Sequence, residues 1–200
     1  GVLADRGLLD LDAPVQRYVP AFPEKPWPVT TRQLVGHVGG VRDFPDEHES
    51  LSTDHCGTTA EALEPFAADP LLFRPGTQFR HSTYGYVLVS AAIETAARAP
   101  YFLFMQREVF EPLGMNDTGP DPAAGDMPGR ATFYFPRFME RTSLGLHPTR
   151  PVDYSCFSGA GAFLSTPSDL VRFGSAMMRG GLLRAETAAM LQAPLHLESG

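Results

Sequence analysis

The clearest helical periodicity in this chain begins near residue 84. From Tyr84 onward, apolar residues recur on one face at intervals of three and four residues. They are Val87, Leu88, Ala91 and Ala92. Ser82 or Thr83 precedes this face and is the expected N-cap, while Pro75-Gly76 suits a type II turn. The pattern therefore predicts a turn, a short polar segment and a capped, buried helix.

Shorter helices are predicted on both sides of this one. Thr58 and Glu61 suit a capping box, and Thr166 with Pro167 suits another helix start. Asp12 is the expected N-cap of a further short helix. Others are predicted within residues 1–9, 29–41, 100–109 and 183–192. Residues 130–135 alternate like a strand, and 143–146 are the expected hairpin partner.

Composition narrows the class of protein. The 200 residues suit a single domain, with 43% hydrophobic and 20% charged residues. The net charge of −7 gives no footprint for nucleic-acid binding. No apolar run approaches the ~20 residues of a membrane span, and no signal peptide is visible.

Two features suggest metal or redox chemistry only weakly. Residues 43–57 are rich in acids and histidine, but without ligand spacing, so a solvated surface loop is favoured over a metal site. Cys56 and Cys156 form no CxxC, so two unpaired thiols are favoured, with a disulfide left open. Gly159-x-Gly161 lacks the context of a phosphate loop. No cofactor and no metal are expected.

Residues 73–86, FRPGTQFRHSTYGY, resemble the second motif of the serine β-lactamase and penicillin-binding protein superfamily. His81 replaces the family's tyrosine. Thr83 replaces its asparagine, as in the branch related to the mitochondrial serine β-lactamase-like protein. Three further segments match, 7–41, 109–118 and 159–170, and the resemblance extends to about Leu191. His55-Cys56-Gly57 has the outline of the third motif but lies in the wrong region.

The resemblance implies an α+β fold of the β-lactamase/transpeptidase type, an antiparallel sheet flanked by helices. This chain would cover mainly the helical lobe and a short β-hairpin. Residues 1–200 are interpreted as the central part of a single domain, with the Ser-x-x-Lys helix before Gly1 and the third motif after Gly200. Alone, such a piece would expose the face that meets the sheet, and we expect it to be poorly soluble.

The implied reaction is acyl transfer through a serine ester, with Ser-x-x-Lys as nucleophile and proton relay. The chain has no such motif, because Phe22 lies three positions before its only lysine, Lys25. His81 and Thr83 are the candidate catalytic positions. An imidazole titrates near ~6.5 and a phenol near ~10, so His81 is a competent substitute base, and a degenerate site stays open. His37 matches a structural histidine of the family.

Two classes of function remain open. The first is a serine hydrolase acting on a β-lactam, an ester or a small peptide. The second is a non-catalytic binding or assembly protein on the same fold, and an oligomer is possible in either. A lipase-type esterase is disfavoured because no G-x-S-x-G occurs. For a bacterial protein we expect a periplasmic or secreted location in preference to a cytoplasmic one.

Overall fold

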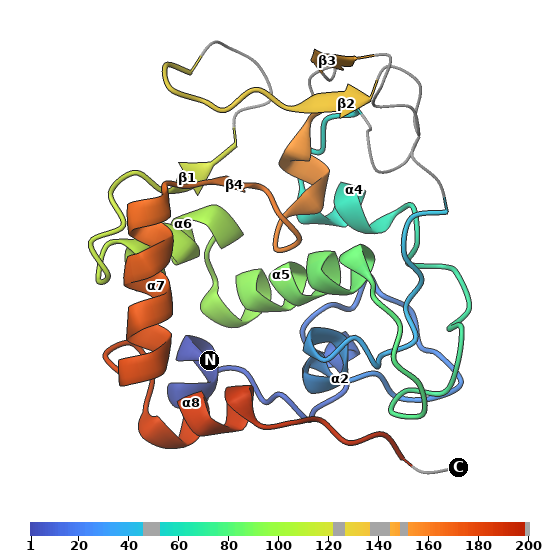
Figure 1. Ribbon diagram of the computed structural model, residues 1–200. Coiled ribbons are helices and arrows are strands. Elements are labelled where there is room, and N and C mark those ends of the chain that lie inside the picture. The colour runs from blue at the N-terminus through green and yellow to red at the C-terminus, as the bar shows by residue number, and fades with distance from the viewer. Residues whose placement is uncertain (46–52, 122–126, 137–144, 149–151, 199–200) are drawn as a thin grey trace.

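The computed structural model describes residues 1–45, 53–121, 127–136, 145–148 and 152–198 (Figure 1). It is mostly helical. The helices are α1 (Val2–Asp5), η1 (Val15–Arg17), α2 (Thr31–Val35), α4 (Thr59–Leu63), α5 (Thr83–Ala97), α6 (Tyr101–Met105), η2 (Gln106–Phe110), η4 (Tyr154–Phe157), α7 (Pro167–Arg179) and α8 (Ala185–Gln192). The strands are β1 (Gly119–Pro120), β2 (Tyr134–Pro136), β3 (Leu146–Pro148) and β4 (Phe163–Leu164).

Helix α5 lies in the middle of the molecule, with shorter helices around it (Figure 1). It packs against α1, α2, α4, α6 and η4. Val87, Leu88 and Ala92 are completely buried, and Tyr84 stacks on Phe66 with ring centroids 4.4 Å apart. Burial of each large apolar side chain contributes about 1.5–3 kcal/mol. The predicted buried helix is confirmed, and it organises the core.

The predicted helix starts are confirmed at three places. Ser82, Thr58 and Thr166 cap α5, α4 and α7, and each side-chain oxygen accepts a hydrogen bond from the backbone N–H three residues later. At α4 the predicted box is different in detail, because the Glu61 carboxylate accepts from the backbone N–H of Gly57. The caps fix where each helix begins, and at α5 this sets the position of residues 81–83.

Asp12 is not an N-cap, contrary to the sequence-based expectation. The expected helix is the 3₁₀ turn η1, which Pro14 precedes. The Asp12 carboxylate instead accepts two hydrogen bonds from the Arg32 guanidinium, at 2.7 and 2.8 Å. A bidentate pair with a residue distant in sequence has replaced the local cap.

Two short antiparallel pairs of strands complete the fold. The predicted hairpin is confirmed as β2 paired with β3, with Tyr134 opposite Pro148, so that it lies slightly later in the chain than predicted. Residues 143 and 144 of the prediction lie outside the described residues. The other pair, β1 with β4, joins Gly119 to Leu164 and was not predicted.

Helix α7 differs from α5 in how little it buries. Asp169 is its one buried residue, whereas Leu170, Val171 and Met178 are 59%, 67% and 78% exposed. The described residues therefore leave the apolar side chains of α7 largely uncovered. No single helix in the described ranges is long and apolar enough to cross a membrane; α5 and residues 101–110 meet that test only together, across a 74° bend.

Candidate active site

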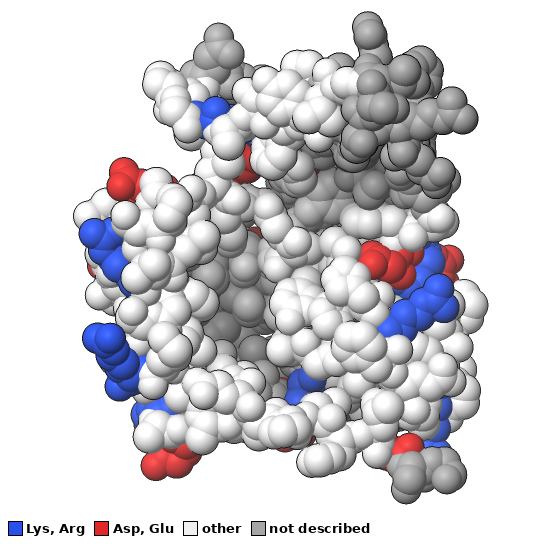
Figure 2. Space-filling view, in the orientation of Figure 1, with Lys and Arg blue, Asp and Glu red and all other residues white. Residues whose placement is uncertain are grey.

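The N-terminus of α5 opens into a cleft of about 730 Å³. Its walls come from the start of α5, from α6 and η2, from residues 159–165 and from α7. The described lining residues are His37, His81, Ser82, Thr83, Tyr86, Tyr101, Met105, Phe110, Met115, Thr118, Gly159, Ala160, Gly161, Phe163, Ser165, Leu170 and Phe173. None of them is Lys, Arg, Asp or Glu. In Figure 2 this face is hollowed beside α7, and most charged side chains lie toward its edges.

The turn that carries His37 supports the start of α5. Nδ1 of His37 accepts a hydrogen bond from the backbone N–H of Ser82 at 3.2 Å, and the His37 carbonyl accepts from Arg80 at 2.9 Å. The Ser82 hydroxyl donates to the carbonyl of Arg42 at 2.8 Å. His37 thus has the structural contacts expected of it, and residues 80–82 are held by a neighbouring loop as well as by their own helix.

Asp43 holds both sequence-predicted catalytic positions. Its Oδ2 lies 2.8 Å from Nδ1 of His81, and its Oδ1 accepts from the backbone N–H of Thr83 at 3.0 Å. Oδ1 also accepts from the backbone N–H of Phe44 at 2.9 Å. The His81 side chain is 65% exposed and lines the cleft, as does Thr83. Asp43 lies outside helix and strand, in keeping with the predicted loop, but its carboxylate is hydrogen-bonded through both oxygens.

The charges around His81 follow from these contacts. Burial by itself raises the pKa of the Asp43 carboxyl, but hydrogen bonds from His81, Thr83 and Phe44 outweigh it and lower the pKa. Burial lowers the pKa of His37, the nearby His81 adds to this, and Asp43 opposes it. The His37 and His81 rings are 4.6 Å apart. The site therefore combines an ionised carboxylate with one imidazole that resists protonation.

Neither cleft phenol nor the single lysine is placed as a base. Burial raises the pKa of Tyr101 to about 12 and also raises that of Tyr86, whose hydroxyl donates to the carbonyl of Val35. Lys25 donates to two backbone carbonyls, at 2.6 and 2.7 Å, and its Nζ lies 4.9 Å from the centre of the Phe22 ring. Among the described lining residues, the two histidines are the remaining side chains with a ring nitrogen that can accept a proton.

The loop opposite His81 approaches α5 too closely for any residue but glycine. Gly159 has φ +78°, and a Cβ there would lie 2.5 Å from the carbonyl oxygen of Tyr86. The Ser90 hydroxyl donates to the carbonyl of Ser158 at 2.9 Å and fixes the same loop. This close contact sets the width of the cleft on that side.

Asp169 anchors α7 to the far wall of the cleft. Its Oδ2 accepts from the backbone N–H of Asp117 at 2.9 Å and from the Thr118 hydroxyl at 2.8 Å. The Thr118 hydroxyl also lies 2.8 Å from that of Ser165, and Arg172 donates to Asp169 at 2.6 Å. No sequence motif indicated this link, because Asp117 and Thr118 lie more than 50 positions from Asp169.

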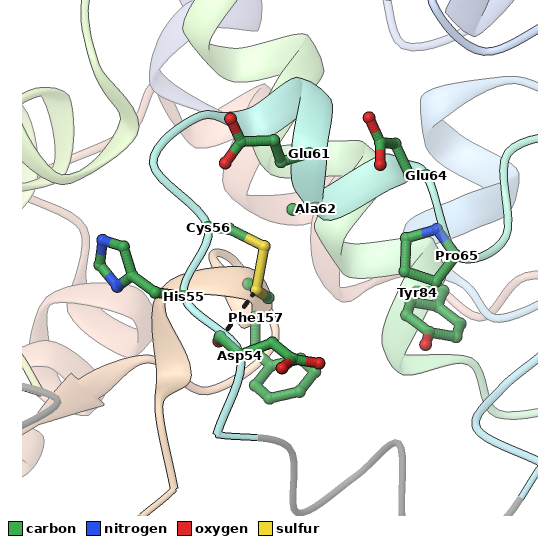
Figure 3. A pocket seen from close by; sticks show the side chains of 10 residues that line it. Asp54, His55, Cys56, Glu61, Ala62, Glu64, Pro65, Tyr84 and Phe157 are labelled. Atoms are coloured by element: carbon green, nitrogen blue, oxygen red, sulfur yellow. Dashed lines mark hydrogen bonds between the residues drawn. A yellow bond between two sulfur atoms is a disulfide. The ribbon is translucent and has the colours of Figure 1, made fainter.

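A second histidine–aspartate pair lies beside a different pocket, of about 380 Å³. Nδ1 of His55 lies 2.9 Å from Oδ2 of Asp153. Figure 3 shows the neighbouring disulfide, Cys56–Cys156, which joins the segment carrying His55 to η4. The expectation of two unpaired thiols was therefore wrong. His55 is not among the described lining residues of the cleft, in keeping with its rejection as a third-motif residue.

The described residues contain no group of three or more His, Cys, Asp or Glu able to hold a metal ion. Of the acidic and histidine-rich stretch discussed above, Asp46, Glu47, His48 and Glu49 lie outside the described residues. Asp43 and His55 are described, and they pair with partners in two separate places.

The comparisons with known proteins agree on one protein family. The sequence pattern that defines the Beta-lactamase family matches residues 1–199. The serine beta-lactamase-like protein LACTB, mitochondrial, of Homo sapiens is 30% identical over an alignment covering 96% of this chain and 50% of that protein. The chain thus spans about half the length of this curated relative.

Two solved structures show the same likeness. A penicillin-binding protein from Bacillus halodurans superposes with a TM-score of 0.81 at 25% identity, covering 98% of this chain and 60% of that one. A D-amino acid amidase from Ochrobactrum anthropi SV3, complexed with D-phenylalanine, gives a TM-score of 0.79 at 26% identity, with coverages of 94% and 55%.

Proposed function

The chain belongs to the beta-lactamase family, and on that basis we propose that it forms one wall of the catalytic cleft of a serine hydrolase. Its fold is of the β-lactamase/transpeptidase type. The proposed reaction is acyl transfer through a serine ester, and the proposed substrate is a β-lactam, an ester or a small peptide. The observation that carries the proposal is the open cleft at the start of α5, which His81 and Thr83 line.

In this proposal the nucleophile comes from another part of the whole protein. Phe22, not serine, lies three positions before the only lysine of the chain, and Nζ of this lysine donates to the carbonyls of Ala67 and Asp69. These residues would then supply mainly the helical lobe of the parent α+β domain. The longer relatives, of which the chain spans about half or more, support such a division.

His81 is proposed to take the proton-transfer position that the family's second motif assigns to a tyrosine. Its exposed ring lies at the mouth of the cleft, and no hydrogen bond to Nε2 occurs within the described residues. Thr83, two residues later and in the first turn of α5, is proposed to contact the substrate. The positive end of the α5 dipole favours developing negative charge there.

The cleft wall favours a neutral substrate with an apolar group. Aromatic and thioether side chains make up much of the lining, among them Tyr101, Met105, Phe110 and Phe163. Relatives named as a penicillin-binding protein and a D-amino acid amidase are compatible with an amide, ester or lactam carbonyl as the bond attacked.

The disulfide supports the proposed location. Cys56 and Cys156 are 100 residues apart and form the one described disulfide. Disulfides persist mainly in secreted, periplasmic and other oxidising surroundings. A periplasmic or secreted location is proposed for a bacterial protein on this ground.

A non-catalytic binding or assembly protein is the alternative, and one observation favours it. Val171 and Met178 on α7 are mostly exposed, although both are apolar. Uncovered apolar side chains on one helix are typical of contact surfaces. In the alternative, such surfaces join subunits and the histidine at the tyrosine position marks a lost activity.

One labelling experiment separates the two functions. The complete reading frame that contains this chain is expressed, incubated with a fluorescent penicillin or a fluorophosphonate, and digested for peptide mapping by mass spectrometry. The hydrolase proposal expects a covalent adduct on a serine followed three residues later by lysine. Absence of any adduct with both probes would overturn it and favour the binding or assembly function.

A further inference from the structure

We propose that Asp43 is the positioning residue for His81, so that a carboxylate–imidazole pair performs the proton transfer assigned by the family motif to a tyrosine. The inference rests on the proposed acyl-transfer function and adds a residue that no sequence motif indicated. Asp43 itself touches no substrate in this account. It acts by fixing which nitrogen of His81 carries the proton and where the ring points.

The geometry of Asp43 is over-determined. Its Oδ1 accepts two backbone hydrogen bonds, from Phe44 at 2.9 Å and Thr83 at 3.0 Å. With one oxygen fixed in this way, the carboxylate plane is fixed, and Oδ2 points to Nδ1 of His81 at 2.8 Å. The loop after His37 and the first turn of α5 are therefore joined through one side chain.

This contact determines the tautomer of His81. An ionised carboxylate only accepts hydrogen bonds, so the proton of a neutral His81 must lie on Nδ1. The lone pair is then on Nε2, the nitrogen for which the described residues offer no partner. A hydroxyl in the cleft within hydrogen-bond reach of Nε2 would find a proton acceptor with its tautomer already set.

The neighbouring titratable groups leave the hydrogen bond between Asp43 and Nδ1 of His81 undisturbed. Hydrogen bonds lower the pKa of Asp43 despite its partial burial, so the carboxylate stays ionised at neutral pH. Among the described residues, His37 is the other titratable group packed against His81; burial lowers its pKa, and its Nδ1 already accepts from Ser82. Tyr86 lies behind His37 and keeps its proton. None of these groups competes with His81 for Asp43.

The proton balance of the step is simple. As the serine Oγ forms its bond to the substrate carbonyl carbon, its proton moves to Nε2 of His81. The resulting imidazolium keeps its Nδ1 proton and is stabilised by the charge on Asp43, which is not itself protonated. When the bond to the leaving nitrogen or oxygen breaks, the Nε2 proton passes to that atom, and neutral His81 is restored.

Asp43→Asn is the sharpest test of the inference. Asparagine keeps an oxygen for the backbone N–H groups of Phe44 and Thr83, so the local fold is preserved. Its NH₂ group, a donor, then faces Nδ1 of His81 and favours the opposite tautomer, with the proton on Nε2. Asp153→Asn is the matched control, because it makes the same change in the His55–Asp153 pair outside the cleft.

Two measurements are made on these variants. ¹⁵N-detected histidine spectra of the complete reading frame should show His81 with its proton on Nδ1, and with it on Nε2 in Asp43→Asn. In the complete reading frame, acylation by fluorescent penicillin should be slowed about 10- to 100-fold by Asp43→Asn, less than the 10²–10⁴ typical of losing a general base. Asp153→Asn should change neither.

Each contrary result has a distinct meaning. If wild-type His81 carries its proton on Nε2, or if Asp43→Asn acylates at the wild-type rate, Asp43 is only a structural contact and the inference is wrong. If the wild-type protein forms no adduct, the proposed function itself fails, and the inference fails with it. If Asp153→Asn slows acylation equally, the effect is general destabilisation and the inference is overturned.

Discussion

The protein contains two histidine–aspartate pairs of nearly identical geometry in very different surroundings. His81–Asp43 and His55–Asp153 are joined through Nδ1 at 2.8 and 2.9 Å, and both imidazoles are more than 60% exposed. Both carboxylates also accept backbone hydrogen bonds, and both have lowered pKa values. Only His81 lines the cleft at the start of α5. The pair is thus a common way to order a loop, and its position decides whether it can do chemistry.

The two pairs are held in place by different interactions. The His55 pair is held beside a disulfide, and Asp153 caps η4 by accepting from the backbone N–H of Ser155. The His81 pair is held by hydrogen bonds alone, between a loop and the first turn of α5. We therefore expect the two pairs to respond differently when their supports are removed.

Removal of the disulfide should have the largest effect on stability. Replacing Cys56 and Cys156 by serine frees a link between residues 100 positions apart, and loss of such a link costs about 2–5 kcal/mol of unfolding free energy. Denaturant unfolding measures the loss. Histidine NMR spectra should show the His55–Asp153 contact weakened and the His81–Asp43 contact kept; equal changes at both pairs would contradict the separation drawn here.

Substitution of Gly159 should disturb the His81–Asp43 pair. Gly159→Ala forces a Cβ to within 2.5 Å of the Tyr86 carbonyl at a positive φ, which we expect to cost about 2–4 kcal/mol from overpacking and backbone strain. Gly114→Ala, at φ +66° with no atom nearby, is the control and should cost about 1–2 kcal/mol.

Thermal unfolding of the two glycine variants tests this difference. The His81 resonances should shift in Gly159→Ala, because Tyr86 packs against His37, which in turn contacts His81. The His55 resonances should stay in place. Equal destabilisation by both substitutions would mean that the close approach to α5 is relieved without cost.

The smallest expected effect is on how the free energy of unfolding decreases at acidic pH. Asp43 and Asp153 have folded-state pKa values below the unfolded value of about 3.9. Their contribution to the free energy of unfolding is therefore fully present above the unfolded pKa and is lost as the pH falls through the folded pKa. Between about pH 5 and pH 2, Asp43→Asn and Asp153→Asn should each lose less unfolding free energy than wild type. The difference should be about 1 kcal/mol or less, because both pairs are exposed to solvent. Urea midpoints at successive pH values would show it, and a steeper decline in either variant would contradict the assigned ionisation.

Local chemistry explains what the sequence could predict. The Pro75-Gly76 turn, the Ser82 cap and the apolar face of α5 depend on residues within a few positions of one another, and all three are present. The Thr166-Pro167 start of α7 was predictable for the same reason. His81 and Thr83 were proposed as catalytic positions from a motif, and in the structure both line one cleft and contact the Asp43 carboxylate.

Contacts between distant residues explain what the sequence could not predict. Asp43 and His81 are 38 positions apart, and Cys56 and Cys156 are 100 apart, so no spacing rule links either pair. Asp12 was misassigned because its partner, Arg32, lies 20 positions away. In each case, a polar residue with a plausible local role found a better partner across the fold.

The central claim is that His81 takes part in acyl transfer, whereas His55, which makes a similar contact with Asp153, does not. The most direct measurement is a mass-spectrometric time course of adduct formation by the complete reading frame, comparing wild type with His81→Ala and His55→Ala at saturating penicillin. The account predicts that His81→Ala acylates about 10²–10⁴-fold more slowly while His55→Ala matches wild type. Equal rates in all three proteins, or equal slowing in the two variants, would contradict it.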